Sequence, residues 1–296
     1  MRSRLQGGGL YFRAGPFVKR VRSMVPLLAP SVLQTYGCYP LASEKDVAEY
    51  VVEVNYTTML RRYVRRQVIA ELDQPTPFVP MAEAHAPLML EMGLNWSLAT
   101  RNASSLIFHA GVAEKNGRAV IIPGLSGQGK STLSAGLALR GWRYLSDEFA
   151  MVDLDTLDVI PYPRPVSLKN QSIEVIRAFA PEAGVTTPME GTHKGTVAYV
   201  PPQPSWIERM DERAKPGAIV FPHYGPDSEP RIEAIAHPEA FMICTASSVN
   251  YDRFGQRSFE ALGRIIDSVP VLAIHYPNLD EGVRLVERIA AGEGLP

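Results

Sequence analysis

The sequence predicts an α/β protein in which a sheet flanked by helices follows a small N-terminal α+β region. Strand-like and helix-like patterns alternate from residue 104 onward, which is typical of sheets covered by helices. A glycine-rich turn separates an apolar strand from a helix within 119–140. The first 75 residues contain short β-type runs joined by turns, which indicate a smaller separate sheet. We therefore expect two domains, residues 1–80 and 81–296.

The N-terminal region predicts a small antiparallel sheet, with β-type stretches at 10–22, 49–55 and 66–72. Residues 23–43 carry no charge, but prolines, a glycine and polar side chains interrupt them. They predict a turn, a short helix and a loop instead of a membrane span. The basic run 60–66 has two interpretations: a contact for phosphate or an acidic partner, or a solvated edge strand or turn. The second is the commoner use, because charge protects sheet edges.

The remaining elements follow from periodicity and turn signals. Residues 75–80 predict a linker, and apolar residues at helical spacing predict a helix over 83–100. Asn116-Gly117 is a hairpin signal between strands at 104–112 and 118–122. Further helices are expected at 131–140, 171–180, 238–248, 256–268 and 279–291, strands at 144–145, 149–152, 217–221, 231–235 and 271–276, and a mobile loop at 181–196. Gly141 is placed to end the first of these helices, and Asn278 with Glu281 has the capping-box spacing that starts the last one.

Composition excludes several classes of protein. Hydrophobic residues make up 46% and charged residues 21% of the 296 residues, as in soluble globular proteins. A formal charge of −1 argues against nucleic-acid binding, which needs surplus cations. The two cysteines, Cys38 and Cys244, allow one disulfide, but we expect reduced thiols, and no Cys/His cluster has zinc spacing. The N-terminus lacks the apolar stretch of a signal peptide and no membrane helix is visible, so we expect a cytoplasmic protein.

The most informative segment is the glycine-rich turn, which matches the Walker A pattern G-x-x-x-x-G-K-[ST] in full. Its residues are Gly124, Leu125, Ser126, Gly127, Gln128, Gly129, Lys130, Ser131 and Thr132. Glycines let successive backbone N–H groups point at phosphate oxygens, and the helix that follows adds its positive end. Lys130 can reach the β- and γ-phosphates, and the Ser131 hydroxyl can ligate Mg²⁺. The segment predicts a nucleotide phosphate site without distinguishing an ATPase, a GTPase or a kinase.

An acidic pair follows this loop at a suitable distance. Asp147 and Glu148 stand at the end of a predicted strand, 17 and 18 residues after Lys130. A strand–helix–strand unit brings such strand ends and the loop to one edge of a sheet. One carboxylate could lie beside Mg²⁺ and the other accept a proton from a hydroxyl acceptor. His109 lies on the strand before the hairpin, where a lone histidine is more often structural than functional.

Together these strings resemble a known family. Phe108-His109-Ala110-Gly111-Val112, Asn116-Gly117, the loop Gly124–Ser131, and Gly141-Trp142-Arg143-Tyr144-Leu145-Ser146-Asp147-Glu148 resemble the catalytic core of HPr kinase/phosphorylase. That resemblance covers about 104–180. Residues 163–170, 172–179 and 194–198 resemble the HPr kinase-related kinase A family, and this closer resemblance extends over nearly the whole chain. It implies the P-loop sheet of the HPr kinase C-terminal domain.

The resemblance implies an ATP- and Mg²⁺-dependent kinase that phosphorylates a hydroxyl, in that family a protein serine. By position, Asp147 matches the catalytic aspartate of the family, Glu148 replaces its second aspartate, and His109 matches its active-site histidine. Lys169 and Lys194 are candidates to supply positive charge around the transferred phosphoryl group. The family association implies a protein or peptide acceptor, including products of neighbouring genes, and a homo-oligomer is compatible with it.

The sequence also departs from the HPr kinase pattern. Ala110 stands in place of the glycine after the histidine, and Thr132 in place of a common glutamate. The downstream Glu-x-Arg-Gly signature has no clear copy, so neither HPr as acceptor nor the reverse phosphorolysis is implied. Two other functions stay open: a P-loop kinase of a small metabolite, and a nucleotide-binding regulatory protein without phosphotransfer.

Overall fold

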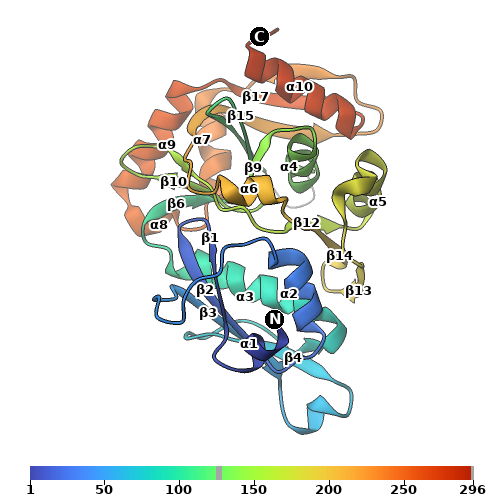
Figure 1. The fold of residues 1–296 in the computed structure, drawn as a ribbon. Helices are drawn as coiled ribbons and strands as arrows, with labels where there is room; N and C mark the ends of the chain where they lie inside the picture. The colour runs from blue at the N-terminus through green and yellow to red at the C-terminus, as the bar shows by residue number, and fades with distance from the viewer. Residues whose placement is uncertain (125–128, 295–296) are drawn as a thin grey trace.

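The computed structural model describes residues 1–124 and 129–294. It is a mixed α/β fold in which an N-terminal sheet with its helices lies below a larger α/β part (Figure 1). The N-terminal sheet has the order β1-β2-β3-β4-β5. Its strands are β1 (Leu10–Ala14), β2 (Phe17–Ser23), β3 (Tyr50–Tyr56), β4 (Gln67–Glu71) and β5 (Met81–Ala82), and its helices are α1 (Arg2–Gln6), α2 (Leu28–Tyr36) and α3 (Ala86–Arg101).

The N-terminal sheet is not wholly antiparallel as expected. β2 and β3 are parallel neighbours, while the other adjacent strands are antiparallel. Parallel neighbours need a crossover, and α2 with the loop after it provides one. Every second residue of β1 and β2 is buried, so one face of the sheet carries the core.

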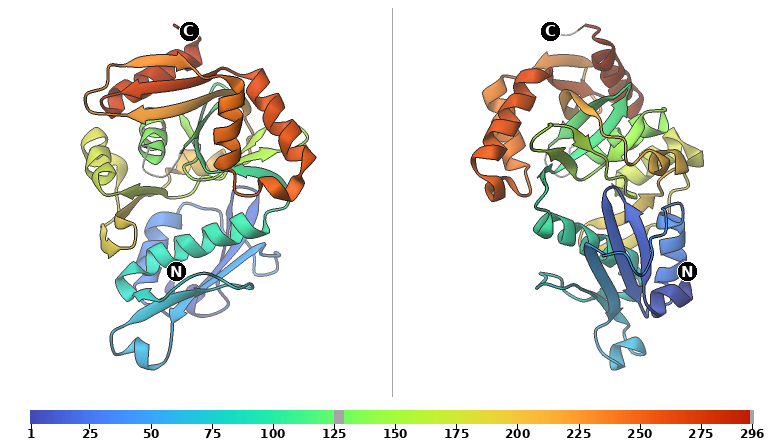
Figure 2. Two further views of the ribbon diagram at one scale, coloured as in Figure 1. Left: turned by 180° about the vertical axis from the view of Figure 1, so that it is seen from behind. Right: turned by 60° about the vertical axis from the view of Figure 1, so that its left-hand side comes forward.

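Residues 81–101 pack with the N-terminal sheet. β5 pairs with β4, and α3 lies across β3 and β4 (Figure 2). Leu90, Leu94 and Leu98 of α3 belong to the same core as the buried face of the sheet. Residues 81–101 therefore pack with the N-terminal sheet although the expected domain boundary, at residue 80, precedes them. The division into two domains stays a prediction, because that core also continues into the larger part through Met151 and Tyr162.

The larger part is built on a six-stranded sheet with the order β16-β17-β15-β8-β7-β9. Its strands are β7 (Ala110–Lys115), β8 (Arg118–Pro123), β9 (Arg143–Ser146), β15 (Lys215–Tyr224), β16 (Arg231–Ala234) and β17 (Val271–Tyr276). β8, β15 and β17 are parallel, and β9 runs in the same direction because β7 is antiparallel to both β8 and β9. The carboxyl ends of these four strands therefore meet at one edge, the usual ligand edge of an open α/β sheet.

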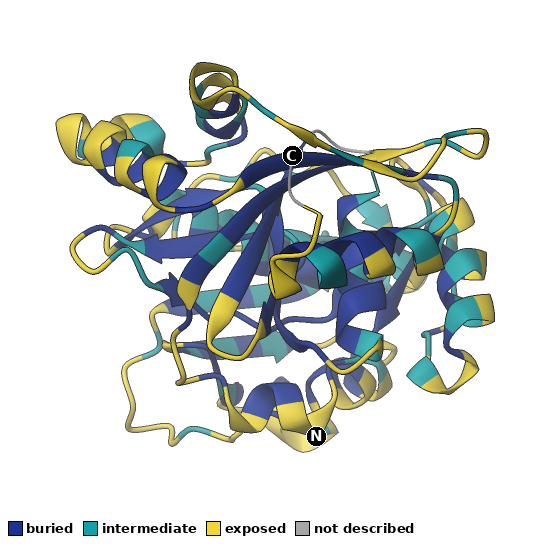
Figure 3. Ribbon diagram, turned by 90° about the horizontal axis from the view of Figure 1, so that it is seen from above, coloured by how far each residue is buried: buried dark blue, intermediate teal, exposed yellow. Residues whose placement is uncertain are grey.

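Helices cover both faces of this sheet, and its strands are buried between them (Figure 3). α4 (Lys130–Leu139) and α10 (Leu279–Ala291) pack on one face, and α7 (His237–Ala246) and α9 (Gln256–Ser268) on the other. Successive side chains of β8 point to opposite faces of the sheet, so this strand contributes to the hydrophobic core on each side. Val120 and Ile122 belong to the core on one face, and Ile121 belongs to the core on the other. The other helices of the larger part are α5 (Gln171–Phe179), α6 (Pro204–Glu208) and α8 (Tyr251–Phe254).

Several expected local signals are confirmed. Asn116 and Gly117 have φ of 54° and 78° between paired Lys115 and Arg118, as a two-residue hairpin requires. α4 ends in a Schellman motif, with Gly141 at φ 91° and the Trp142 amide donating to the Leu137 carbonyl. At the start of α10, the Asn278 side chain accepts a hydrogen bond from the Glu281 amide.

Two small sheets complete the larger part and correct two expectations. They are β11 (Val159–Ile160), β10 (Ala150–Asp153) and β6 (Ser105–Phe108), and β12 (Val166–Lys169), β14 (Gly195–Val200) and β13 (Met189–Thr192). The strand expected over 104–112 is broken at His109, where β6 leaves one sheet and β7 enters another. The loop expected over 181–196 instead contains β13, because the Thr192 hydroxyl and Gly195, at φ 82°, close a hairpin with β14.

The basic run lies in an exposed connection between β3 and β4. It contains the short 3-10 helix Leu60–Arg62, and Arg66 pairs with Glu83 at 3.1 Å. This fits the expectation of a solvated turn. Further 3-10 turns span Glu83–His85 and Pro181–Ala183. Cys38 and Cys244 are free, and within residues 1–124 and 129–294 no helix is both long and apolar enough to cross a membrane.

Candidate active site

A cavity of about 620 Å³ opens at the edge where the carboxyl ends of the parallel strands meet. It gathers most of the residues singled out in the sequence: His109, Gly129, Lys130, Ser131, Thr132, Asp147, Glu148, Lys169 and Lys194. Gly124 directly follows β8 and is buried, but it is not among the described lining residues. Leu125, Ser126, Gly127 and Gln128 lie outside the described residues. Their expected contact with phosphate therefore stays a prediction.

The end of the glycine-rich segment has the geometry that its sequence predicts. Gly129 adopts φ 85° and is the N-cap of α4, so the N-terminus of this ten-residue helix faces the cavity. A Cβ on Gly129 would lie 3.1 Å from Oη of Tyr276, so a side chain would be crowded as well as strained. Lys130 is buried, and burial together with Lys169 lowers its pKa to about 8.

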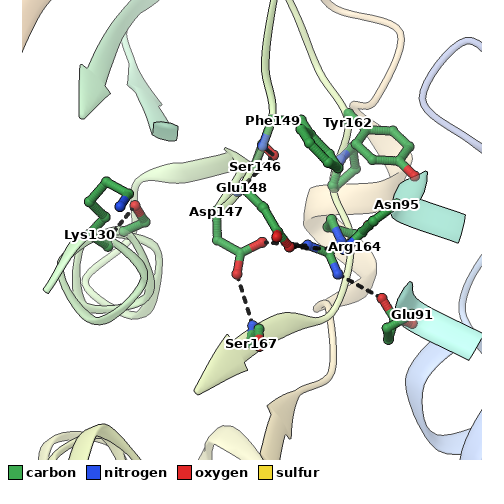
Figure 4. A network of polar contacts seen from close by, with 12 residues as sticks. Glu91, Asn95, Lys130, Ser146, Asp147, Glu148, Phe149, Tyr162, Arg164 and Ser167 are labelled. Atoms are coloured by element: carbon green, nitrogen blue, oxygen red, sulfur yellow. Dashed lines mark hydrogen bonds and ion pairs between the residues drawn. The ribbon is translucent and has the colours of Figure 1, made fainter. Parts of the chain in front are cut away.

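Asp147 lies just beyond β9, buried and held by two donors. The Tyr144 hydroxyl donates to Oδ1 at 2.9 Å. The Ser167 amide donates to Oδ2 at 2.8 Å (Figure 4). Burial raises the pKa of this carboxyl above its usual value, although Arg164 and both hydrogen bonds oppose the rise. A carboxylate with a raised pKa accepts a proton more readily at neutral pH.

Glu148 has the opposite electrostatic environment. Burial favours its neutral form, but the charges of Arg164, His109 and Lys194 outweigh burial and lower its pKa to about 2. Its Oε2 accepts hydrogen bonds from Arg164 and, at 2.9 Å, from Asn95. Glu148 therefore stays ionised at neutral pH, whereas the neighbouring Asp147 has a raised pKa and takes up a proton more readily.

Arg164 is a central residue of this site that sequence reasoning missed, as are its neighbours Glu91 and Asn95. Arg164 is 2% exposed. Its guanidinium donates to Glu148, lies 3.6 Å from Oδ1 of Asp147 and donates to Oε2 of Glu91 at 2.7 Å. Burial lowers the pKa of Arg164, but these three carboxylates hold it well above its usual value. The signal available in the sequence was an arginine between two prolines, Pro163 and Pro165, where a surface position is the ordinary expectation.

The N-terminal part contributes to the site through α3. Glu91 and Asn95 are four residues apart and share one face of that helix, from which they reach Arg164 and Glu148. Glu91 also accepts a hydrogen bond from the hydroxyl of Tyr36 on α2. The helix expected over 83–100 is present as α3 with Leu88 buried, and the buried Glu91 carries polar contacts.

The remaining predicted residues line the cavity wall. His109 occupies the break between β6 and β7, where its amide donates to the Ser247 carbonyl at 2.7 Å. Burial lowers the pKa of its imidazole, which favours the neutral form. Lys169 ends β12, and Lys194 lies in the β13–β14 hairpin. Burial also lowers the pKa of Lys194, while Glu148 opposes that change.

The donor set fits Mg²⁺ bound together with a phosphate ligand. Among the described residues no group of three or more His, Cys, Asp or Glu side chains could hold a metal ion. Mg²⁺, however, usually takes one or two carboxylates and completes its shell with phosphates and water. Ser131, Asp147 and Glu148 line one cavity. Both oxygens of Asp147 already accept hydrogen bonds, whereas the two bonds to Glu148 go to Oε2, so Glu148 is the better direct ligand.

Similarity to known proteins is found among solved structures. No protein-family model matches the chain, and no curated protein matches it. Among solved structures, it is similar to the HPr(Ser) kinase/phosphatase from Coxiella burnetii, with 14% identity over 63% of this chain and 98% of that chain and a TM-score of 0.27.

Proposed function

We propose that the protein is an ATP- and Mg²⁺-dependent kinase that transfers the γ-phosphoryl group to a hydroxyl, the serine of a protein or peptide. One observation carries this proposal. Asp147, a buried carboxylate with a raised pKa, lies in the same cavity as Lys130, Ser131 and the N-terminus of α4. Phosphate-binding groups and a proton acceptor thus share one site, which is what transfer to a hydroxyl requires.

In this mechanism the acceptor oxygen attacks the γ-phosphorus in line. The new O–P bond forms as the bond to the β-phosphate oxygen breaks, ADP departs, and the acceptor proton passes to Asp147. Lys130, Lys169 and Lys194 neutralise charge on the transferred group. Desolvation lowers the pKa of both Lys130 and Lys194. Mg²⁺, held by Ser131 and Glu148 with Asp147 nearby, would supply further charge neutralisation on the phosphates.

A transfer assay with γ-labelled ATP tests the proposal. Purified protein is incubated with cell extract and with purified products of neighbouring genes, and label is followed separately in proteins and small molecules. We expect label on protein serine. Label confined to the small-molecule fraction would indicate a metabolite kinase, and saturable ATP binding without loss of the γ-phosphate would indicate a regulatory protein.

The residue assignment has its own control. Asp147→Asn should bind ATP as the wild type does and lose transfer, because the amide cannot accept the acceptor proton. Asp155→Asn is the matched control, since Asp155 is exposed and pairs only with Arg257 among described residues. Full transfer by Asp147→Asn would exclude Asp147 as the proton acceptor.

A further inference from the structure

The cavity continues past α4 to a wall whose described lining residues are uncharged. Tyr224 is the last residue of β15 and Tyr276 the last of β17, and the two are aligned as neighbours across the parallel pair. Their ring centroids are 6.0 Å apart with planes tilted by 52°. Both tyrosines line the cavity, together with Leu279 at the start of α10 and Val175 of α5.

This wall adjoins the residue before Lys130. A Cβ built on Gly129 would lie 3.1 Å from Oη of Tyr276 and 3.8 Å from Cβ of Tyr224. A phosphate bound at Lys130 would therefore have the tyrosines next to it on one side. The carboxylates Asp147 and Glu148 line the same cavity from the end of β9.

The order of the strands separates these two walls. β15 and β17 lie on one side of β8, and β7 and β9 lie on the other. With about 4.8 Å between neighbouring strands, the end of β15 is roughly 14 Å from the end of β9. An extended nucleoside triphosphate fits that arrangement with its γ-phosphate toward the carboxylates and its base toward the tyrosines.

The chemistry of the wall suits a base. Tyr224 lines the cavity and is 50% exposed, which is high for a residue with a large aromatic ring. An aromatic face left open in this way can stack on a nucleobase, and such stacking depends little on which base is present because every base has a π-face. Tyr276 is buried behind it, and Leu279 adds apolar surface.

We infer that Tyr224, backed by Tyr276 and Leu279, forms the subsite for the nucleotide base, on the side of Lys130 opposite the catalytic carboxylates. This inference rests on the proposed function in one respect only, that a nucleoside triphosphate binds in the cavity. The nucleotide then lies with its base against Tyr224 and its γ-phosphate toward Asp147 and Glu148, and stacking on Tyr224 provides the affinity for the base.

Binding measurements on the full chain test it without any transfer assay. ATP and inorganic tripolyphosphate, each with Mg²⁺, are titrated into the wild type and Tyr224→Ala by calorimetry. We expect Tyr224→Ala to weaken ATP binding about tenfold and to leave tripolyphosphate binding unchanged. Tyr63→Ala is the matched control, since Tyr63 is an exposed tyrosine in the β3–β4 connection.

Each result decides a different claim. Equal ATP affinity in the wild type and Tyr224→Ala, or an equal loss for ATP and tripolyphosphate, would overturn the base subsite alone. A wild type that binds neither compound would overturn the proposed function as well. Tyr224→Trp gives a second measurement: its added tryptophan fluorescence should change with ATP and not with tripolyphosphate, and the opposite pattern would contradict stacking at this position.

Discussion

Nη2 of Arg164 lies 2.7 Å from Oε2 of Glu91, and this buried pair joins the carboxylates of the candidate active site to helix α3 of the N-terminal part. Arg164 precedes β12, whereas Glu91 is 73 residues earlier in the chain. The position of the guanidinium beside Asp147 and Glu148 therefore depends on the N-terminal part as well as on its own strand.

Removing Glu91 should destabilise the protein. Glu91→Ala leaves Arg164 buried without one of its carboxylates, and we expect the free energy of unfolding to fall by about 3 kcal/mol. Urea denaturation measures this change. Glu91→Gln, which can still accept the hydrogen bond, should lose less. Glu208→Ala, an exposed glutamate on α6, is the control and should change little; equal stability of Glu91→Ala and Glu208→Ala would contradict the role given to the pair.

Tyr144→Phe should move the acid limb of the pH–rate profile. The Tyr144 hydroxyl stabilises the ionised form of Asp147, whose pKa is already raised by burial. Without that hydrogen bond the pKa rises further, and the rate, which falls as Asp147 becomes protonated, should begin to fall about half a pH unit higher. The measurement is kcat/KM for transfer against pH. Tyr50→Phe, at a buried tyrosine of the N-terminal sheet, should keep the wild-type profile, and an unshifted Tyr144→Phe profile would exclude this coupling.

Lys19 should make the stability depend on pH near neutrality. It is buried in β2, donates to the Tyr162 hydroxyl, and burial lowers its pKa to about 7. The unfolded chain then binds more protons than the folded chain between pH 7 and 10.5, so stability rises with pH in that window. We expect a gain of about 1.5 kcal/mol from pH 7 to 8.5.

The comparison with two variants isolates this effect. Lys19→Met should flatten the rise, and Lys45→Met, at an exposed lysine, should preserve it. Urea unfolding across this pH range provides the measurement. A rise of the same size in Lys19→Met would assign the pH dependence to another group.

Gly111→Ala should be destabilising because β7 passes close to α4. A Cβ at residue 111 would lie 1.9 Å from Oγ of Ser134. We expect a loss of about 2 kcal/mol by overpacking. Ser134→Ala removes that oxygen, so the double variant should be more stable than Gly111→Ala alone in thermal unfolding. If the second substitution gives no recovery, the contact with Ser134 is not the cause.

Local signals in the sequence predicted local structure well. The Asn116-Gly117 hairpin, the end of α4 at Gly141 and the Asn278 cap of α10 all depend on residues a few positions apart, and all are present. The cavity also gathers the described residues from Gly129 to Thr132 with Asp147 and Glu148, because one strand–helix–strand unit positions them.

What the sequence could not predict depends on distant contacts. Arg164, Glu91 and Asn95 meet only after the two parts have packed, and no spacing in the chain encodes that meeting. The parallel pairing of β2 with β3 follows from where α2 crosses, and the Gly- and Thr-rich segment forms a hairpin because β14 offers it a partner strand.

The polar contacts of Arg164 also constrain how such a chain can change over evolutionary time. A phosphate-binding loop and a catalytic aspartate are often regarded as an independent unit that can be combined with any partner domain. Here a transplanted segment starting after α3 would leave Glu91 and Asn95 behind, and Arg164 and Glu148 would each lose a polar contact. Exchange of the N-terminal part would have to carry that helix face with it, so the two parts are expected to be inherited as one unit.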